Sequence, residues 1–161
     1  MPKAGGRYDM FSGRVRKQLD KKGRIVIPKR YRSVFLNQGD ERLALLVMDG
    51  CIQIYPWHFW ERIQDEILAL PPLDPRTREL QRIWGGVLDQ GEIDAEGRIK
   101  LDEELKREAH IVRDVVLVGA INKVEVWDPE TYERYRDGLP SPEEVGRQMS
   151  QDARFKGRRD A

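Results

Sequence analysis

The chain has 161 residues, of which 35% are charged, 39% hydrophobic and 8% aromatic. This length predicts one compact domain or two half-domains, and the aromatic content argues against wholesale disorder. A single cysteine, Cys51, excludes an intrachain disulfide and a zinc site built from several cysteines. The longest apolar run, residues 115–121, is far shorter than the roughly 20 residues that cross a bilayer. The first residues contain no apolar signal-peptide segment. We therefore expect a soluble cytoplasmic protein without a membrane partner.

Positive charge is concentrated at the beginning of the chain. Residues 1–40 contain eleven Lys or Arg and three Asp or Glu, although the formal net charge of the whole chain is +1. A basic segment followed by an acidic remainder is typical of proteins that bind a polyanion such as a nucleic acid. An uneven but merely solvated surface is the alternative that composition leaves open.

The first half of the chain predicts short strands, turns and helices in a definite order. Gly23 closes a turn that needs a positive φ, Pro28 suits the first position of a helix, and Asp49-Gly50 is a strong hairpin signal. The predicted elements are a strand over 14–19, a turn over 20–23, a strand over 24–27, a helix over 29–35, strands over 43–48 and 51–55, and a helix over 57–70.

The second half repeats this order. Asp20-Lys-Lys-Gly-Arg-Ile25 matches Asp94-Ala-Glu-Gly-Arg-Ile99 at a spacing of 74 residues, and Ile52-Gln-Ile-Tyr55 matches Val124-Glu-Val-Trp127 at a spacing of 72. Two units are too few for a solenoid. We therefore expect a duplicated half that pairs with its twin around a pseudo-two-fold axis. Its further elements are a helix over 77–84, a helix capped by Asp102, and hairpin strands over 115–120 and 123–127.

These patterns divide the chain into four segments. We expect residues 1–9 to form a flexible N-terminal extension and residues 10–73 to form the first repeat, which is basic. Residues 74–137 hold a linker helix and the second repeat. Residues 138–161 contain two prolines and small polar residues without periodicity, so we expect a disordered tail there.

The paired Asp-x-x-Gly-Arg turns carry a resemblance to a known family. The first copy, from Asp20 to Pro28, resembles the swapped-hairpin element of AbrB/SpoVT-type DNA-binding domains. Two copies in one chain, with Tyr55-Pro56 downstream, resemble the MraZ family of bacterial transcriptional regulators over about residues 10–137. The resemblance implies an α+β fold in which two tandem AbrB-like swapped-hairpin half-domains form one pseudo-two-fold β-barrel, with short helices packed outside and a flexible C-terminal tail.

The resemblance also implies a function. It predicts a ring-like homo-oligomer associated with the nucleoid that represses the division and cell-wall gene cluster, including its own gene, by binding repeated short sites in double-stranded promoter DNA. Two features depart from the family pattern. Family members usually begin near Met10-Phe11-Ser12-Gly13, so residues 1–9 precede the usual start, and Ile27-Pro28 of the first copy is replaced by Leu101-Asp102 in the second.

Charge distinguishes the two copies. Residues 10–63 carry eleven basic and five acidic residues, whereas residues 84–137 carry eight and fourteen. At a spacing of 73, Val87 and Asp89 replace Arg14 and Arg16 of the first copy. We therefore expect DNA on the first copy, with a smaller role for Arg98. The candidate DNA-binding residues are Arg14, Arg16, Lys17, Lys21, Lys22, Arg24, Arg32 and Arg98. The residues expected to build the turns are Asp20, Gly23, Asp94 and Gly97.

Each basic residue has a chemical role in this hypothesis. Lys and Arg on a paired strand neutralise phosphates and give affinity without sequence information. Arg24 follows a glycine turn, and its guanidinium can bind O6 and N7 of a guanine in the major groove. The alternative is architectural: Asp20 caps its own turn, and Arg24 pairs with an acid across the barrel.

The remaining chemically active residues do not form a catalytic pattern. His58 and His110 have no metal-ligand partner at a suitable spacing, and Cys51 in a hairpin strand is interpreted as a small hydrophobic residue. Neighbouring glutamates such as Glu103-Glu104 do not face each other on a helix, and no phosphate loop or dinucleotide fingerprint is present. We expect no enzyme, metal, cofactor or small-molecule substrate. An antitoxin-like or scaffolding module and a non-specific nucleic-acid binder are the alternative functions.

Overall fold

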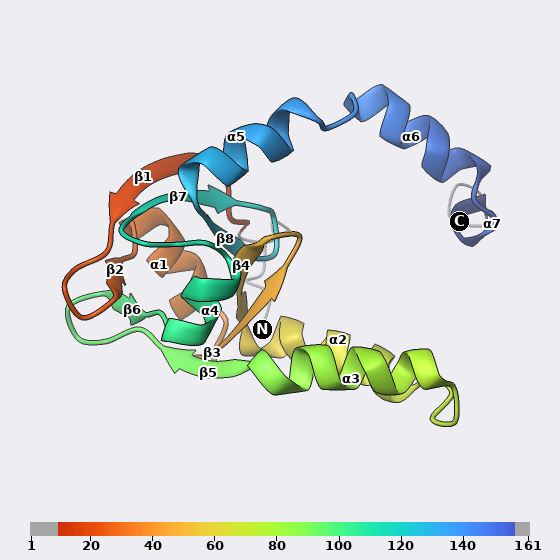
Figure 1. Ribbon diagram of the computed structural model, residues 1–161, viewed down its shortest axis with the longest axis horizontal. Coiled ribbons are helices and arrows are strands. Elements are labelled where there is room, and N and C mark those ends of the chain that lie inside the picture. The colour runs from red at the N-terminus through yellow and green to blue at the C-terminus, as the bar shows by residue number, and fades with distance from the viewer. Residues whose placement is uncertain (1–9, 157–161) are drawn as a thin grey trace. The chain divides into compact units, whose positions relative to one another are not determined.

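Residues 10–156, which the computed structural model describes, contain two antiparallel sheets and seven helices (Figure 1). The strands are β1 (Arg14–Gln18), β2 (Arg24–Val26), β3 (Arg42–Met48), β4 (Cys51–Pro56), β5 (Asp89–Glu92), β6 (Arg98–Lys100), β7 (Asp114–Gly119) and β8 (Val124–Trp127). The helices are α1 (Lys29–Leu36), α2 (Trp57–Leu68), α3 (Pro75–Val87), α4 (Glu103–Glu108), α5 (Pro129–Asp137), α6 (Pro142–Gln151) and α7 (Ala153–Lys156). The chain divides into two compact units, with the boundary between Thr131 and Tyr132. The predicted α+β class is confirmed.

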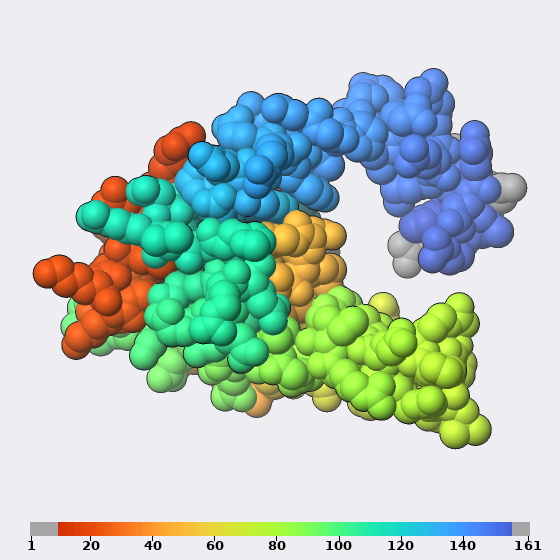
Figure 2. Space-filling view, viewed as in Figure 1, coloured from red at the N-terminus to blue at the C-terminus, as the bar shows by residue number. Residues whose placement is uncertain are grey.

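The strand order shows that the two halves exchange strands. The larger sheet has the order β1-β7-β8-β4-β3-β5, and the smaller one pairs β2 with β6. The first strand of each half thus pairs with the third strand of the other half: β1 with β7, and β5 with β3. β1 pairs with β7, and at the left of Figure 2 red atoms from the first half of the chain lie against teal atoms from the second half. Exchanging the two halves leaves this order unchanged, as a pseudo-two-fold arrangement of the strands requires.

The register corrects one part of the repeat alignment. Arg16 lies opposite Val116 in β7, and Gln90 lies opposite Ala44 in β3. Val116 and Ala44 occupy equivalent hairpin positions, opposite Trp127 and Tyr55 respectively. Arg16 therefore corresponds to Gln90 at a spacing of 74, and the expected match with Asp89 at 73 is wrong. The second copy contains one extra residue before β5. Every residue of β5 therefore lies one position further along the chain than the alignment at 73 predicts.

Alternating side chains bury two apolar clusters within residues 10–131. Inward-facing residues of β3, β4, β7 and β8 pack with Ile25 and Ile99 of the small sheet and with α1 and α4. On the opposite face of the large sheet, Ala44, Leu46 and Tyr55 pack against Trp60 of α2 and Trp84 of α3. Both halves contribute to the first cluster, which therefore holds the two sheets together.

The second departure from the family pattern leaves the helix starts equivalent. Pro28 precedes α1 with φ −54° and ψ 144°, and Asp102 precedes α4 with φ −64° and ψ 146°. The Asp102 side chain also accepts a hydrogen bond from the backbone N–H of Glu104. A fixed proline φ and an aspartate cap thus begin the same helix in the two copies.

The segment expected to be a disordered tail contains helices. Ser141 accepts a hydrogen bond from the backbone N–H of Glu144, and Pro142 occupies the first turn of α6, with α7 following. The prediction that residues 138–161 lack regular structure is wrong for this part of the chain, because Ser-Pro-Glu-Glu is a helix-start signal. The extension over 1–9 and the last five residues of the tail, 157–161, lie outside the described residues. Over residues 10–156, no helix is both long and apolar enough to span a membrane.

Candidate nucleic-acid interface

The two-stranded ribbon of β2 and β6 presents one basic face. Ile25 and Ile99 lie opposite each other, and both are fully buried in the core. Because side chains alternate along a strand, their neighbours point to the opposite side of the ribbon. This outer face holds Arg24 and Val26 from the first copy and Arg98 and Lys100 from the second. Arg24 pairs with Lys100 and Val26 with Arg98, so both copies contribute to one surface.

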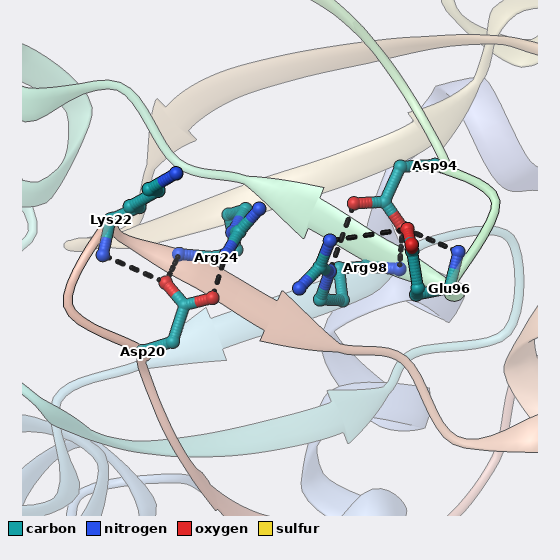
Figure 3. A network of polar contacts seen from close by, with 6 residues as sticks. All are labelled: Asp20, Lys22, Arg24, Asp94, Glu96 and Arg98. Carbon is teal, nitrogen blue, oxygen red and sulfur yellow. Dashed lines mark hydrogen bonds and ion pairs between the residues drawn. The ribbon is translucent and has the colours of Figure 1, made fainter.

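An aspartate braces the turn before each strand of the ribbon (Figure 3). In the first turn, Asp20 Oδ1 accepts hydrogen bonds of 2.9 Å from the backbone N–H groups of Lys22 and Arg24, and Oδ2 lies 2.7 Å from Arg24 Nε. In the second turn, Asp94 makes the same contacts with the backbone N–H groups of Glu96 and Arg98, and Oδ2 lies 3.0 Å from Arg98 Nε.

These contacts settle how each arginine is held. Asp20 caps its own turn, as expected, but the ion pair of Arg24 is with Asp20 and not with an acid across the molecule. Hydrogen bonds from the backbone N–H and the side chain of Arg24 hold the pKa of Asp20 below its usual range, and Arg98 has the same effect on the pKa of Asp94. Both carboxylates are therefore ionised at neutral pH and fix the arginine orientation.

The two arginines differ in local charge. Arg98 has a second acidic partner, because its Nη2 lies 3.1 Å from Glu96 Oε2. The corresponding residue of the first turn is Lys22, which is exposed. Arg24 thus lies in a more positive environment than Arg98, although both belong to the same ribbon face.

Each turn is also supported by a basic side chain from the helix of the other copy. Gly97 has φ +76°, and the guanidinium of Arg32 in α1 occupies the space that a Cβ at this position would need. Gly23 has φ +77°, and Lys106 Nζ of α4 lies 3.0 Å from its Cβ position. Arg32, expected among the DNA-binding residues, is half-buried against the second turn, and its buried Nε has no hydrogen-bond partner among the described residues.

The other predicted basic residues lie along β1 and the first turn. Arg14, Arg16, Lys21 and Lys22 are exposed. Lys17 is half-buried. A groove of about 790 Å³ contains Arg16 and Lys17 together with Asp114, Asp128 and Glu130, so its charge is mixed. Arg14 and Arg16 belong to the large sheet, whereas Arg24 and Arg98 belong to the ribbon.

Sequence reasoning missed two residues of the ribbon face, Val26 and Lys100. The sequence of both short strands contained the information needed to find them. Each strand has a central isoleucine, and if that isoleucine is buried, the residues before and after it lie together on the outer face. The charge count instead placed DNA mainly on the first copy, kept Arg98 as the candidate from the second copy, and so passed over Lys100.

Cys51 and His58 lie outside the ribbon. Burial and the neighbouring Glu125 carboxylate raise the pKa of the Cys51 thiol, which disfavours a reactive thiolate. His58 stacks on Phe59, and burial lowers its pKa. Within residues 10–156, no group of three or more His, Cys, Asp or Glu side chains is placed to hold a metal ion.

The fold and this site define a class of protein: a duplicated α+β chain whose halves exchange strands and together build a basic two-stranded ribbon flanked by aspartate-braced turns. A sequence model of the family described as "MraZ protein, putative antitoxin-like" matches the chain twice, over residues 10–83 and 89–151. The chain belongs to the MraZ family.

Curated relatives cover most of the chain. A protein of Thioalkalivibrio sulfidiphilus (strain HL-EbGR7) is 40% identical over 129 residues, which are 80% of this chain and 86% of the relative. One from Haemophilus influenzae (strain PittEE) is 41% identical over 120 residues, 73% of this chain and 80% of the relative. One from Natranaerobius thermophilus is 33% identical over 132 residues, 82% of this chain and 90% of the relative. All three are named "Transcriptional regulator MraZ".

Proposed function

We propose that this protein is a transcriptional regulator that binds double-stranded DNA sequence-specifically. It acts as a repressor of the division and cell-wall gene cluster, including its own gene, and is associated with the nucleoid. The single observation that carries the DNA-binding proposal is the outer face of the ribbon, where Arg24, Arg98 and Lys100 gather on two paired strands. The names of the relatives support the regulatory role.

The ribbon has a suitable geometry for the major groove, which admits a two-stranded β-ribbon as well as a helix. Arg24 and Arg98 are held by their aspartates and present rigid guanidinium groups, which suits two-pronged recognition of guanine O6 and N7. Exposed Arg14, Arg16, Lys21 and Lys22 of the first copy neutralise phosphates and add affinity that does not depend on sequence.

The proposal includes the barrel architecture and the assembly. The buried faces of the ribbon and of the large sheet meet in one core cluster, which supports a swapped-hairpin barrel formed by the two halves. Three large apolar side chains on or between α2 and α3 are exposed: Leu68, Leu73 and Ile83. Exposed apolar side chains of this kind favour the binding of another subunit to α2 and α3. We infer a ring-like homo-oligomer, in which several ribbons engage repeated short DNA sites together.

The test compares the affinity for DNA upstream of the protein's own gene with the affinity for unrelated DNA of equal length, by fluorescence anisotropy. We expect Arg24→Ala to remove most of the preference for the upstream DNA while the protein stays folded. Arg134→Ala, which removes an exposed arginine of α5, is the matched control and should keep the preference. Arg98→Ala in the same assay measures the contribution of the second copy.

Salt dependence separates the two kinds of contact. Two to three phosphate contacts on each of three or four subunits predict a slope of roughly −5 to −10 for log affinity against log salt. Lys22→Ala should reduce this slope and weaken all DNA sequences alike. A scaffolding or antitoxin-like module predicts no DNA affinity, and a non-specific binder predicts a salt slope without preference for the upstream DNA. Either result contradicts the proposal.

A further inference from the structure

The outer face of the ribbon contains one apolar side chain among its cations. Val26 is 47% exposed, whereas Ile25, its neighbour on the inner side, is fully buried. Val26 lies directly opposite Arg98 and two positions after Arg24 on the same face. Directly opposed side chains of an antiparallel pair have Cβ atoms about 5 Å apart, so Val26 is within reach of whatever these arginines contact.

The equivalent position in the second copy is occupied by a cation. The pseudo-two-fold axis passes through the Ile25–Ile99 pair and relates Val26 to Lys100. The two ends of the ribbon therefore differ chemically, because Arg24 faces Lys100 at one end and Arg98 faces Val26 at the other. A DNA site read by this ribbon meets two cations at one end, and one cation with an apolar group at the other.

Only one group on the major-groove edges of the bases matches an apolar partner. Guanine presents two acceptors there, adenine an acceptor and a donor, cytosine a donor, and thymine an acceptor together with its C5-methyl group. A valine offers two methyl groups and no hydrogen-bonding atom. Its position beside Arg98 places an apolar contact next to a guanine-reading guanidinium.

We propose that Val26 is a specificity-determining residue that contacts the C5-methyl group of a thymine beside the base read by Arg98. This inference rests on the proposed DNA-binding function. Lys100, at the equivalent position of the other copy, contacts a phosphate or a guanine acceptor instead. Because the two ends of the ribbon select different groups, each subunit binds its short site in a single orientation.

A thymine-by-thymine replacement tests this inference on the full-length protein. Each thymine of the upstream DNA is replaced in turn by deoxyuridine, which lacks only the methyl group. For the wild-type protein we expect replacement of one thymine in each repeated site to weaken binding about fourfold, the effect of one buried methyl group. For Val26→Ala we expect similarly weakened binding to normal DNA and no further loss at that thymine.

Lys100→Ala is the control, because it changes the same face but leaves Val26 in place. It should weaken binding to the normal DNA but keep the deoxyuridine effect. The inference is overturned if wild-type affinity is insensitive to every replacement, or if Val26→Ala stays as sensitive as wild type. A light-scattering mass that falls in Val26→Ala also overturns it, since Val26 is then a subunit contact. Absence of any preference for the upstream DNA in the wild-type protein contradicts the proposed function itself and is visible before any base is replaced.

Discussion

Arg24 and Arg98 carry their charge in a geometry that neighbouring residues impose. Each guanidinium is bound through Nε by an aspartate four residues earlier, and the same aspartate accepts two backbone N–H groups of the turn. Each aspartate therefore neutralises part of the local positive charge but restricts the rotamers of its arginine. For recognition of a planar group such as guanine, fewer rotamers to lose on binding means a smaller entropic penalty.

Gly97 shows the strongest steric requirement of the two turns, and it leads to a stability prediction. Gly97→Ala must place a methyl group at φ +76° and displace the Arg32 guanidinium, the end of a flexible side chain, so we expect a loss of about 2–3 kcal/mol in the free energy of unfolding. Gly39→Ala is the matched control, because Gly39 has φ +79° and no heavy atom within 4 Å of its Cβ position. That variant should lose only the backbone contribution, about 1–2 kcal/mol.

Urea unfolding followed by circular dichroism measures both variants. Adding Arg32→Ala to the Gly97→Ala protein removes the overlap and should recover most of the difference between the two glycine variants. Equal losses at Gly97 and Gly39 are incompatible with the Arg32 contact.

At the level of elements, the β4–β8 pair joins the two halves of the large sheet through a polar contact on the pseudo-two-fold axis. Gln53 and Glu125 lie opposite each other, and Gln53 Nε2 donates to Glu125 Oε2 at 3.4 Å. Glu125 also accepts from Trp127 Nε1 at 3.2 Å. Tyr55 donates to Gln53 Oε1 at 3.0 Å, and burial raises the pKa of Tyr55 to about 12. The duplicated chain thus places an amide opposite a carboxylate where identical halves would place two identical groups.

Gln53→Glu puts two carboxylates on this axis, and we expect it to destabilise the fold at neutral pH by about 1–3 kcal/mol. Mutual repulsion and burial raise the folded-state pKa of the new pair above the unfolded value near 4.3. A raised folded-state pKa favours the folded protein at low pH, so the deficit relative to wild type should shrink as pH falls toward 4. Glu125→Gln, which gives two amides, should show no such pH dependence. Unfolding free energies at pH 7 and pH 4.5 test this, and a deficit that grows at low pH contradicts it.

The same elements show what the sequence could and could not predict. The sequence repeat predicted the pseudo-two-fold axis and the paired turns, because identical residues such as Asp20/Asp94 and Arg24/Arg98 recur at one spacing. The role of Arg32 could not be predicted, because it depends on α1 of one copy meeting the turn of the other, and no local pattern encodes that contact. The β5 register was misplaced by one residue, because the glycines used to align the copies lie on opposite sides of the insertion. The assignment of DNA contacts to particular residues is still a prediction.

At the scale of the whole molecule, exposed leucine and isoleucine side chains predict assembly. Leu73, between α2 and α3, is 88% exposed, and Leu68 and Ile83 are also exposed. We expect the wild-type protein to have a light-scattering mass above that of a dimer at micromolar concentration, and Leu73→Asp to lower it by charging a surface buried between subunits. Val112→Asp is the matched control, because Val112 is equally exposed but precedes β7. A wild-type mass of one or two chains, or an equal effect of both variants, contradicts an interface at α2–α3.

Strand exchange has a consequence during protein synthesis. Arg14 of β1 finds its partner Val118 of β7 only 104 residues later in the chain. At about 5–20 residues per second, a ribosome needs roughly 5–20 seconds to deliver that partner after β1 has emerged. Throughout this interval β1 has a free hydrogen-bonding edge, and its arginines and lysine keep it from pairing with other nascent chains. We therefore expect the basic residues that the proposed function assigns to DNA also to reduce aggregation of the nascent chain.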